Sequence, residues 1–247
     1  MVLPAVPGAA IGRAGAHPLS FAAPVTSKGE ATRAAIFQAA LDLFKAQGYE
    51  ATTMRAIADR AGVSLGSSYH YFPSKEHLIL ELYRRLHALH REACAPLLAR
   101  ERGFAARLRG VLRAIVMTWE PYHEVAGSLF STVADPRSPL NPFGAESVAL
   151  REEVIALYAE LLRGSDAKLP ADVAAELPRL LWLYQMGVLY FWIMDGSPGR
   201  LKTLDLIDET ADLLVQLVSL AHLPLLRSSR RRALALVRAI AGDAPDN

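Results

Sequence analysis

Residues 52–72 read TTMRAIADRAGVSLGSSYHYF, and this stretch decides the fold of the first part of the chain. Thr53 can cap a short helix, because its hydroxyl accepts hydrogen bonds from the free N–H groups of the first turn. Gly62 can then take the positive φ of a tight turn at little steric cost. Ser64 can cap a second helix, which Pro73 ends. Two short helices joined by a glycine turn predict a helix-turn-helix.

The second helix of this motif has a polar surface with almost no charge. Gly66 and Ser67 are small and allow close approach to the major groove of DNA, while hydroxyl groups and helix N-termini can bind phosphate. The same surface carries Ser64, Tyr69, His70 and Tyr71. Lys75 adds a positive charge just inside the next helix. These residue types predict DNA binding, but a capped helical hairpin without DNA contact also fits the glycine spacing.

Helical spacing continues on both sides of the motif. Apolar residues recur over 36–44 and again over 78–86, which predicts a helix before the motif and another that begins at Ser74. Beyond Cys94 each periodic segment is typical of a helix. The expected helices are about 103–120, 122–134, 145–163, 171–194, 200–222 and 229–241. No segment alternates as a strand would, so the sequence predicts an all-α fold.

The composition excludes several classes of protein. A chain of 247 residues that is 52% hydrophobic can fold around a substantial core and is not wholly disordered. Its single cysteine excludes a disulfide framework and fits a reducing compartment. The longest apolar stretch, 180–194, contains Gln185 and is shorter than the roughly 20 residues of a spanning helix. Residues 1–10 lack the basic start of a secretion signal. We therefore expect a cytoplasmic protein.

Charge is distributed unevenly along the chain. Residues 27–91 contain nine basic and six acidic residues, residues 92–223 contain 12 and 17, and residues 224–247 contain five and two. A basic front and an acidic middle predict different partners for the two parts. Residues 1–26, rich in alanine, proline and glycine, are predicted to be a disordered extension, unless translation starts further along the chain.

The run from Thr32 to about Tyr83 resembles the DNA-binding domain of the TetR family of transcriptional regulators. The family pattern looks like T-x-R-x-I-A-x-x-A-G-V-S-x-G-x-x-Y-x-Y-F-x-S-K-E-x-L. The sequence matches it at Thr53, Arg55, Ile57, Ala58, Ala61, Gly62, Val63, Ser64, Gly66, Tyr69, Tyr71, Phe72, Ser74, Lys75, Glu76 and Leu78. The resemblance implies a three-helix, helix-turn-helix DNA-binding domain over 27–75.

The resemblance also implies a role for individual residues of the motif. Phosphates would be bound by Thr53, Tyr69, Tyr71 and Lys75, and bases would be contacted by Arg55, Leu65, Gly66, Ser67 and His70. Leu65 can reach a thymine methyl but cannot donate to guanine, so we expect apolar contact to contribute to specificity. Two positions depart from the family: position 68, commonly large and apolar, is serine, and position 56, often aspartate, is alanine. These changes leave less helix packing and no capping box with Thr53.

Residues 76–223 are predicted to form a larger helical domain, which the resemblance identifies as the ligand-binding and dimerisation part. In the family, the last two long helices of this part pair across a two-fold axis as a four-helix bundle, and the matching segments are 171–194 and 200–222. The candidate interface residues are Leu183, Gly187, Tyr190, Met194, Leu204, Ile207, Ala211, Leu214, Leu217 and Val218. Such stripes also occur in ordinary helix cores, so periodicity alone leaves dimerisation open.

Aromatic residues concentrate in two places of this domain and predict a ligand pocket. Mostly apolar walls with a few polar groups are typical of small-molecule sites, and they favour an apolar or aromatic effector over a highly charged one. The candidate effector-binding residues are Met117, Trp119, Tyr122, His123, Phe130, Trp182 and Gln185. The alternative for each of them is ordinary core packing.

Other polar groupings carry weaker signals. His87, His90 and Cys94 share one helix face, but no fourth ligand accompanies them and nothing indicates a reactive thiol, so we predict no metal site. His123 and Glu124 are neighbours in a helix and cannot face each other as a catalytic pair. The sequence contains no nucleophile elbow, phosphate-binding glycine loop or metalloprotease motif. We therefore predict neither an enzyme nor a cofactor.

A final basic segment, 224–247, is predicted to form a helix and tail. It contains Arg227, Arg230, Arg231, Arg232 and Arg238 among apolar residues. Its arginines can be solvated or paired with the acidic middle of the chain. Extra contact with DNA phosphates or with a membrane surface is the alternative.

These features predict a homodimeric repressor that binds a pseudo-palindromic operator through the 64–72 helix and is released by a small apolar or aromatic effector. Two alternatives remain. An effector-independent DNA-binding protein, whose helical half recruits a protein partner, would have a filled core without a cavity. A helical-bundle enzyme would have a buried constellation of titratable residues.

Overall fold

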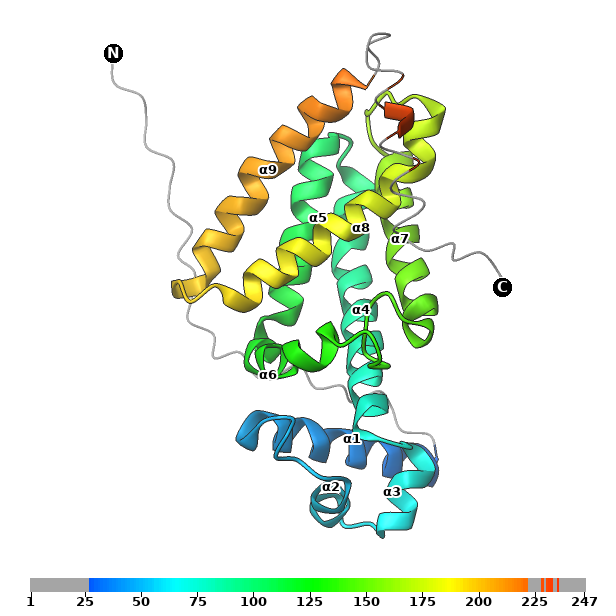
Figure 1. Ribbon diagram of the computed structural model, residues 1–247, viewed down its shortest axis with the longest axis vertical. Helices are drawn as coiled ribbons and strands as arrows, with labels where there is room; N and C mark the ends of the chain where they lie inside the picture. The colour runs from blue at the N-terminus through cyan, green and yellow to red at the C-terminus, as the bar shows by residue number, and fades with distance from the viewer. Residues whose placement is uncertain (1–26, 222–227, 229, 233–234, 236–247) are drawn as a thin grey trace.

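The computed structural model of the chain describes residues 27–221, 228, 230–232 and 235. These residues are mainly helical and contain no β-strand, which confirms the predicted all-α class. Figure 1 shows a lower lobe, which contains α1, α2 and α3, and an upper bundle, with the long helix α4 joining the two. In the described part of the chain, no helix has both the length and the apolar composition needed to cross a bilayer.

The lower lobe contains α1 (Lys28–Gln47), α2 (Met54–Ala61) and α3 (Leu65–Tyr71). From this lobe α4 (Lys75–Arg100) runs up into the bundle and continues through Pro96. The rest of the bundle consists of α5 (Phe104–Trp119), α6 (His123–Ala134), α7 (Val148–Arg163), α8 (Ala171–Met194) and α9 (Leu201–Leu220). Short 3₁₀ turns precede three of these helices, at Glu120–Tyr122, Ala145–Ser147 and Pro198–Arg200.

Local capping explains where the helices of the motif begin and end. The Thr53 hydroxyl accepts a hydrogen bond from the N–H of Ala56 at 3.1 Å, and the Ser64 hydroxyl accepts one from the N–H of Ser67 at 3.1 Å. Gly62 has a φ of 67°, in the left-handed region that glycine adopts without strain. The predicted caps and the predicted glycine turn are therefore confirmed.

Two hydrophobic clusters of buried residues stabilise the chain. The first lies in the lower lobe and includes Ile57 of α2 and Leu78 of α4. Leu129 of α6 joins this cluster, so α6 packs on the lower lobe. The second lies among α4, α5, α7, α8 and α9, and Cys94 of α4 belongs to it. α4 therefore contributes to the cores of both lobes.

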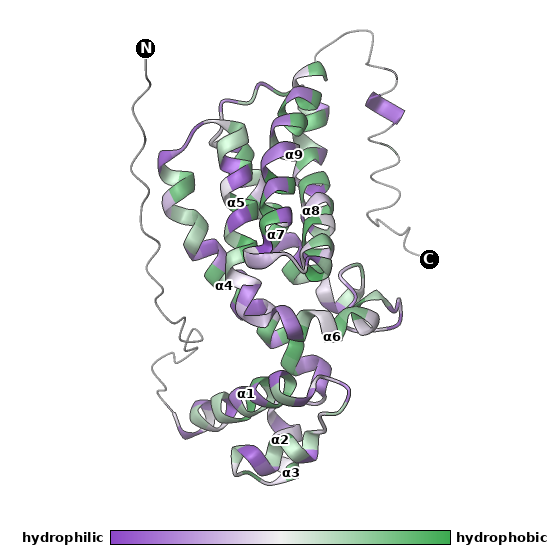
Figure 2. Cartoon of the chain, turned by 90° about the vertical axis from the view of Figure 1, so that its left-hand side faces the viewer, coloured by the Kyte–Doolittle hydropathy of each residue, from purple (hydrophilic) through white to green (hydrophobic). Residues whose placement is uncertain are grey.

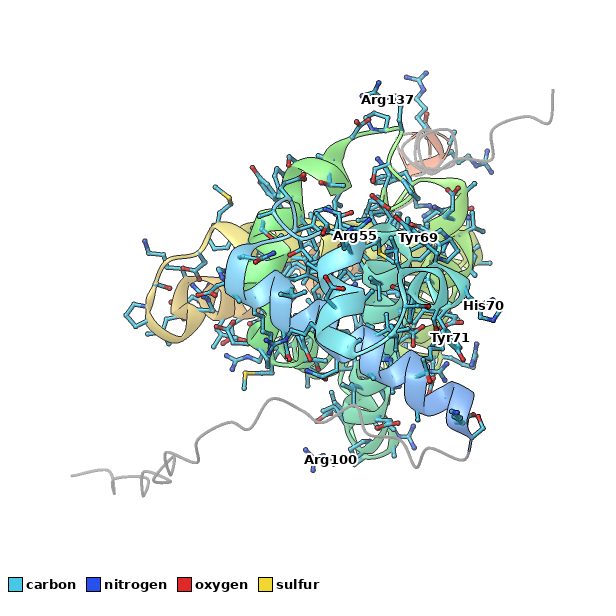
Figure 3. The ribbon with its side chains drawn as sticks, turned by 90° about the horizontal axis from the view of Figure 1, so that it is seen from below. Arg55, Tyr69, His70, Tyr71, Arg100 and Arg137 are labelled. Atoms are coloured by element: carbon cyan, nitrogen blue, oxygen red, sulfur yellow. The ribbon has the colours of Figure 1, made fainter. Side chains whose placement is uncertain are left out.

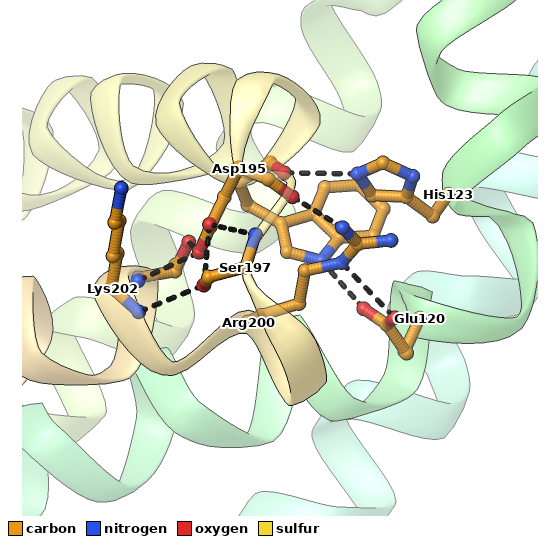
Figure 4. A network of polar contacts seen from close by, with 8 residues as sticks. Glu120, His123, Asp195, Ser197, Arg200 and Lys202 are labelled. Carbon is orange, nitrogen blue, oxygen red and sulfur yellow. Dashed lines mark hydrogen bonds and ion pairs between the residues drawn. The ribbon is translucent and has the colours of Figure 1, made fainter.

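A network of polar contacts fixes the turn between α8 and α9 (Figure 4). The Asp195 carboxylate accepts hydrogen bonds from the backbone N–H groups of Ser197 and Thr203, both at 2.9 Å. Burial alone would raise the pKa of Asp195, but hydrogen bonds from the hydroxyl and the backbone N–H of Ser197, and from the same two groups of Thr203, hold it well below its usual range. Arg200 pairs with Glu120, which follows α5, at 3.2 Å. The turn is thereby attached to the junction between α5 and α6.

Some predictions fall on residues outside the described part of the chain. These are the disordered extension at 1–26 and most of the basic segment at 224–247, including Arg227 and Arg238. Arg230 is described, and its guanidinium donates to the carboxylate of Asp172 at 3.0 Å. This ion pair is of the kind expected between the basic segment and the acidic middle of the chain.

Candidate nucleic-acid interface and ligand cavity

The free surface of α2 and α3 lies at the end of the molecule, remote from the bundle (Figure 1). Thr53 and Arg55 are exposed on α2, and Arg55 makes no hydrogen bond or ion pair with any described residue. Ser64 and Gly66 are exposed at the start of α3, where Ser67 is partly buried. A guanidinium without an internal partner is available to a base or a phosphate.

Aromatic side chains occupy the second half of α3. The Tyr69 side chain is 47% exposed, and His70 beside it is exposed as well. Tyr71 is partly buried, and its ring lies edge-on to that of His70 with the centroids 5.2 Å apart. The hydroxyl of Tyr71 lies near Gly29, where an added Cβ would be 3.4 Å away. Tyr71 therefore connects the end of α3 with the first turn of α1.

Lys75 lies just beyond α3 and is held by the lower lobe itself. Its ammonium group donates a hydrogen bond to the carbonyl oxygen of Tyr49 at 2.8 Å and lies 4.3 Å from the centroid of the Tyr49 ring. An ammonium group has three donors, so this contact fixes its position and leaves N–H groups for a second acceptor. Phosphate binding by Lys75 is compatible with this geometry and stays a prediction.

The side chains of Leu65 and Ser68, also on α3, are directed toward the interior of the lower lobe. Leu65 is partly buried and packs against the lower hydrophobic cluster, which leaves only part of it for contact with a thymine methyl. Ser68 is fully buried, and its hydroxyl has no hydrogen-bond partner among the described residues. Position 68 is thus a core position, and its small polar side chain leaves a polar group without compensation.

Figure 3 views the molecule from the end that carries α2 and α3, with Arg55, Tyr69, His70 and Tyr71 labelled. In this view Arg55 of α2 lies near Tyr69, and His70 lies near Tyr71 toward the edge of the lower lobe. Their individual roles at a base or a phosphate stay predictions. The geometry agrees with the requirement that a helix entering a groove presents small and polar groups on its free side.

The bundle contains a partly enclosed cavity of about 230 Å³. For comparison, an engineered protein cavity of about 150 Å³ holds benzene. Four of the predicted effector-binding residues line the cavity, namely Trp119, Phe130, Trp182 and Gln185. The Oε1 of Gln185 accepts a hydrogen bond from the buried hydroxyl of Tyr158 at 2.8 Å, which fixes its orientation.

Three predicted effector-binding residues lie elsewhere. Met117 is 67% exposed and faces away from the cavity wall. Tyr122 is buried in the lower hydrophobic cluster, under the ammonium group of Lys45. His123 hydrogen-bonds the carbonyl oxygen of Trp192 at 3.0 Å, in the network near the α8–α9 turn. These three residues do not line this cavity, because closeness in sequence does not fix which face of a helix a side chain occupies.

The sequence prediction missed the wall that α4 gives to the cavity. Tyr83, His87 and His90 all line it. Their spacing of four and three residues puts them on one helix face, and the same spacing had drawn attention to His87 and His90 as weak metal-ligand candidates. Among the described residues, no group of three metal-binding side chains lies close enough together to hold an ion.

Both histidines of this wall are buried. The Nε2 of His90 contacts the carbonyl oxygen of Val111 at 2.9 Å, and its Nδ1 has no partner. Because a carbonyl oxygen only accepts, Nε2 carries the proton. Burial lowers the pKa of His90 to about 4. Burial also lowers the pKa of His87, whose Nε2 lies 3.5 Å from the Glu153 carboxylate.

Cys94 lies one turn beyond these histidines and is fully buried in the upper hydrophobic cluster. Burial raises the pKa of its thiol to about 12. The thiolate form, which reacts with electrophiles and metals, is therefore disfavoured.

The predicted dimer stripe divides into exposed and buried parts. On α8, Gly187, Tyr190 and Met194 are exposed, and on α9 Leu217 is 63% exposed. Leu183, Leu204, Leu214 and Val218 are partly buried against the upper cluster. Figure 2 shows hydrophobic segments along both helices.

Ile207 and Ala211 need a correction. Both are fully buried in the upper cluster of the same chain and are therefore not available to a second copy. The exposed apolar residues of α9 are Leu217, which the predicted stripe contains, and Leu201, Leu213 and Leu220, which it does not. α9 is apolar on more than one face, and the predicted stripe combines the buried Ile207 and Ala211 with the exposed Leu217.

The fold and its free helical surface define a class of protein, the helix-turn-helix DNA-binding proteins with a helical regulatory part. Residues 36–82 match the model of bacterial regulatory proteins, tetR family, and residues 107–230 match that of the tetracyclin repressor-like, C-terminal domain. The second match covers half of the chain, which therefore belongs to the TetR family. It is a DNA-binding transcriptional regulator, in a family whose members are generally not enzymes.

Two curated relatives of the chain are transcriptional repressors. The HTH-type transcriptional repressor KstR2 of Rhodococcus jostii (strain RHA1) is 29% identical over 175 residues, which cover 70% of each protein. The HTH-type transcriptional repressor KstR of the same organism is 49% identical over 53 residues, which cover 22% of this chain and 25% of that protein. The higher identity thus belongs to the shorter match.

Solved structures share the fold. FadR of Thermus thermophilus, a TetR-family repressor in complex with lauroyl-CoA, has a TM-score of 0.57 at 25% identity, covering 77% of this chain and 95% of that one. A TetR-family regulator from Syntrophomonas wolfei has a TM-score of 0.59 at 17% identity, covering 74% and 94%. The second likeness concerns the fold alone.

Proposed function

We propose that this chain is a repressor that binds DNA as a homodimer through α3 and releases it when a small apolar molecule occupies the cavity of the bundle. We assign residues 27–75 to DNA binding, residues 76–223 to effector binding and dimerisation, and α3 to the role of recognition helix. Two copies are needed because one helix of seven residues reaches few bases, and a two-fold axis repeats its contacts on a pseudo-palindrome.

One observation carries this proposal: α4 belongs to both lobes. Leu78 and Ile79 at its start are buried in the lower cluster with α1 and α2. Tyr83, His87 and His90, further along the same helix, line the cavity. A ligand that binds more tightly to one position of α4 than to another favours that position, and the lower lobe moves with α4. In a dimer this movement changes the distance between the two α3 helices.

The cavity also favours a small-molecule effector over the alternative of a protein partner, which would be compatible with a filled core. Its wall is mainly aromatic and aliphatic, as expected for an apolar ligand. A relative of similar fold, FadR of Thermus thermophilus, is described as a complex with lauroyl-CoA. An effector with a long apolar part is therefore a reasonable first choice for testing.

The test begins with selection of bound genomic DNA fragments by the full chain, followed by fluorescence anisotropy with the selected site. We expect two chains per site and a steep fall of affinity with salt, because basic groups displace ions from phosphate. The double variant Tyr69→Ala, His70→Ala should bind the site no better than unrelated DNA. The control Phe143→Ala removes an exposed aromatic ring from the segment between α6 and α7, where it contacts Trp182, and should bind the DNA site normally in the absence of a ligand.

Two results would contradict the proposal. One is binding of a single chain per site without symmetry in the selected DNA. The other is an operator complex that no apolar ligand dissociates, although the ligand binds the cavity. The second result would leave DNA binding intact and would favour the protein-partner alternative.

A further inference from the structure

The charge of the cavity wall points to the chemistry of its ligand. Among the described residues that line the cavity, Arg151 is the one whose side chain carries a full charge at neutral pH. The wall contains no aspartate or glutamate. Because burial lowers the pKa of both His87 and His90, the two imidazoles are neutral and add polar groups without charge.

Arg151 projects from the second turn of α7 and is held at the cavity by two of its other lining residues. Its Nη1 donates to the carbonyl oxygen of Pro142 at 2.8 Å, and its guanidinium carbon lies 5.8 Å from the centroid of the Trp182 ring. In the described part of the chain, no carboxylate forms an ion pair with Arg151. The guanidinium is oriented, and most of its N–H donors lack a protein acceptor.

An anion that enters an apolar cavity needs a charged partner, because an unpaired ion loses its hydration without compensation. A guanidinium suits a carboxylate best, since two parallel N–H groups match its two oxygens. A cation of the same shape would meet the positive charge of Arg151 and no carboxylate in the lining, although the carboxylate of Glu153 lies 3.5 Å from the Nε2 of His87. The cavity should therefore bind an anionic ligand more tightly than a cationic ligand of the same shape.

We propose that the cavity binds an apolar carboxylic acid, with its carboxylate on Arg151 and its hydrocarbon part against the aromatic and aliphatic wall. This proposal rests on the proposed function of the cavity as the effector site. The neutral imidazoles of His87 and His90, which also line the cavity, can serve a second polar group of the ligand. An acyl thioester with a phosphate-bearing carrier is also anionic, and the experiment separates it from the free acid.

The test compares three ligands of one shape and different charge, namely decanoate, 1-decanol and decylamine. Decanoyl-CoA is measured beside them as the thioester. Binding to the full chain is measured by calorimetry at pH 7. We expect decanoate to bind about tenfold or more tightly than 1-decanol, the ratio typical of one hydrogen bond to a charged group, and decylamine to bind weakest. Decanoate should also dissociate the operator complex at the lowest concentration of the three.

Variants test whether the preference for decanoate depends on Arg151. Arg151→Gln should abolish the preference for decanoate over 1-decanol, while Arg151→Lys should keep part of it. Arg163→Gln, an exposed arginine at the end of the same helix, should keep the full preference. Met186→Trp, which fills the cavity, should weaken decanoate and 1-decanol alike, and thermal unfolding checks that each variant is folded.

The failures can be told apart. Equal affinity for decanoate and 1-decanol, with no change in Arg151→Gln, would overturn the carboxylate proposal and leave the cavity as an effector site. Binding of decanoyl-CoA without binding of decanoate, and unchanged by Arg151→Gln, would overturn it in favour of a thioester. Binding of none of these ligands, with no release of operator, would overturn both proposals.

Discussion

The guanidinium of Arg33 on α1 donates two hydrogen bonds to the carboxylate of Glu81 on α4, at 2.9 and 2.8 Å. Arg84 and Arg85 also donate to this carboxylate, each at 2.8 Å. Glu81 is buried, and burial alone would raise its pKa, but the hydrogen bonds from Arg33 and Arg85 lower it to about 2. This ion cluster joins the helix that lines the cavity to the first helix of the lower lobe.

Glu81→Gln is expected to lower the free energy of unfolding by about 1.5–3 kcal/mol, the usual range for hydrogen bonds to a buried charge. It leaves three arginines close together without their common carboxylate. Urea unfolding followed by circular dichroism measures the change. Asp42→Asn, which removes an exposed pair with Arg60 in the same lobe, should change stability by no more than about 0.5 kcal/mol.

The same carboxylate predicts a pH dependence. Its folded pKa of about 2 lies below the usual value of 4.5, so its contribution is fully present above about pH 5 and is lost as the pH falls through the folded pKa. The stability difference between the wild type and Glu81→Gln should therefore shrink between pH 5 and pH 2. A difference that stays constant over this interval would show that the pKa of Glu81 is the same in the folded and the unfolded chain.

Ser68→Ala is expected to stabilise the lower lobe by about 0.5–1 kcal/mol. The substitution removes a buried hydroxyl without a partner and improves helix propensity. Thermal unfolding of the two proteins measures the difference. Destabilisation would mean that the hydroxyl of Ser68 is hydrogen-bonded in solution.

Arg55→Ala is expected to cost about 1–3 kcal/mol of operator binding and to relax the preference at one base pair, if Arg55 contacts a base as we propose. Anisotropy titrations at fixed salt, with the operator and its single-base variants, measure both effects. Arg100→Ala removes the same charge from the far end of α4 and should change neither. Equal losses on all variants would assign Arg55 to a phosphate.

Leu65→Ala tests the apolar contact at the start of α3. We expect a larger loss of affinity on half-sites that carry thymine than on half-sites in which that thymine is replaced, because the methyl group is the partner of the leucine side chain. An electrophoretic mobility assay with both half-sites measures the two losses. Equal losses would show that Leu65 acts through packing against the lower lobe alone.

Leu217→Glu is expected to convert the proposed dimer to a monomer, because it places a charge on the outward apolar side of α9. Light scattering after size-exclusion chromatography measures the mass. Val148→Glu, on the exposed apolar surface of α7, is the matched control and should leave the mass unchanged. A Leu217→Glu protein with the mass of the wild type would place the interface elsewhere.

The helices of the motif could be predicted from the sequence because their limits are local. Thr53 and Ser64 need only the N–H groups three residues further on, and Gly62 needs only its own backbone. The exposed side of α3 could be predicted for the same reason. Its own residues are mostly small or polar, so no large apolar side chain requires burial there.

The cavity could be predicted only in part, because its wall combines helices that are distant in sequence. Trp119 and Trp182 were found from aromatic content, whereas Arg151 and the α4 side chains have no local signal that separates them from an ordinary helix surface. The dimer stripe on α9 failed at Ile207 for a related reason. The apolar residues on the two faces of α9 recur with the same helical spacing. Which face is buried depends on the packing of α9 against α5 and α8, and the sequence of α9 alone does not contain this information.

The burial of Cys94 makes selective thiol labelling of this chain possible. The chain has one cysteine, and its thiol is enclosed by the bundle with a pKa far above neutral pH. In the variant Asp59→Cys, a spin label or fluorophore would react with the new thiol on α2, because position 59 is exposed and Cys94 is buried. Paired labels in a dimer would report the separation of the two DNA-reading ends directly, before and after decanoate is added.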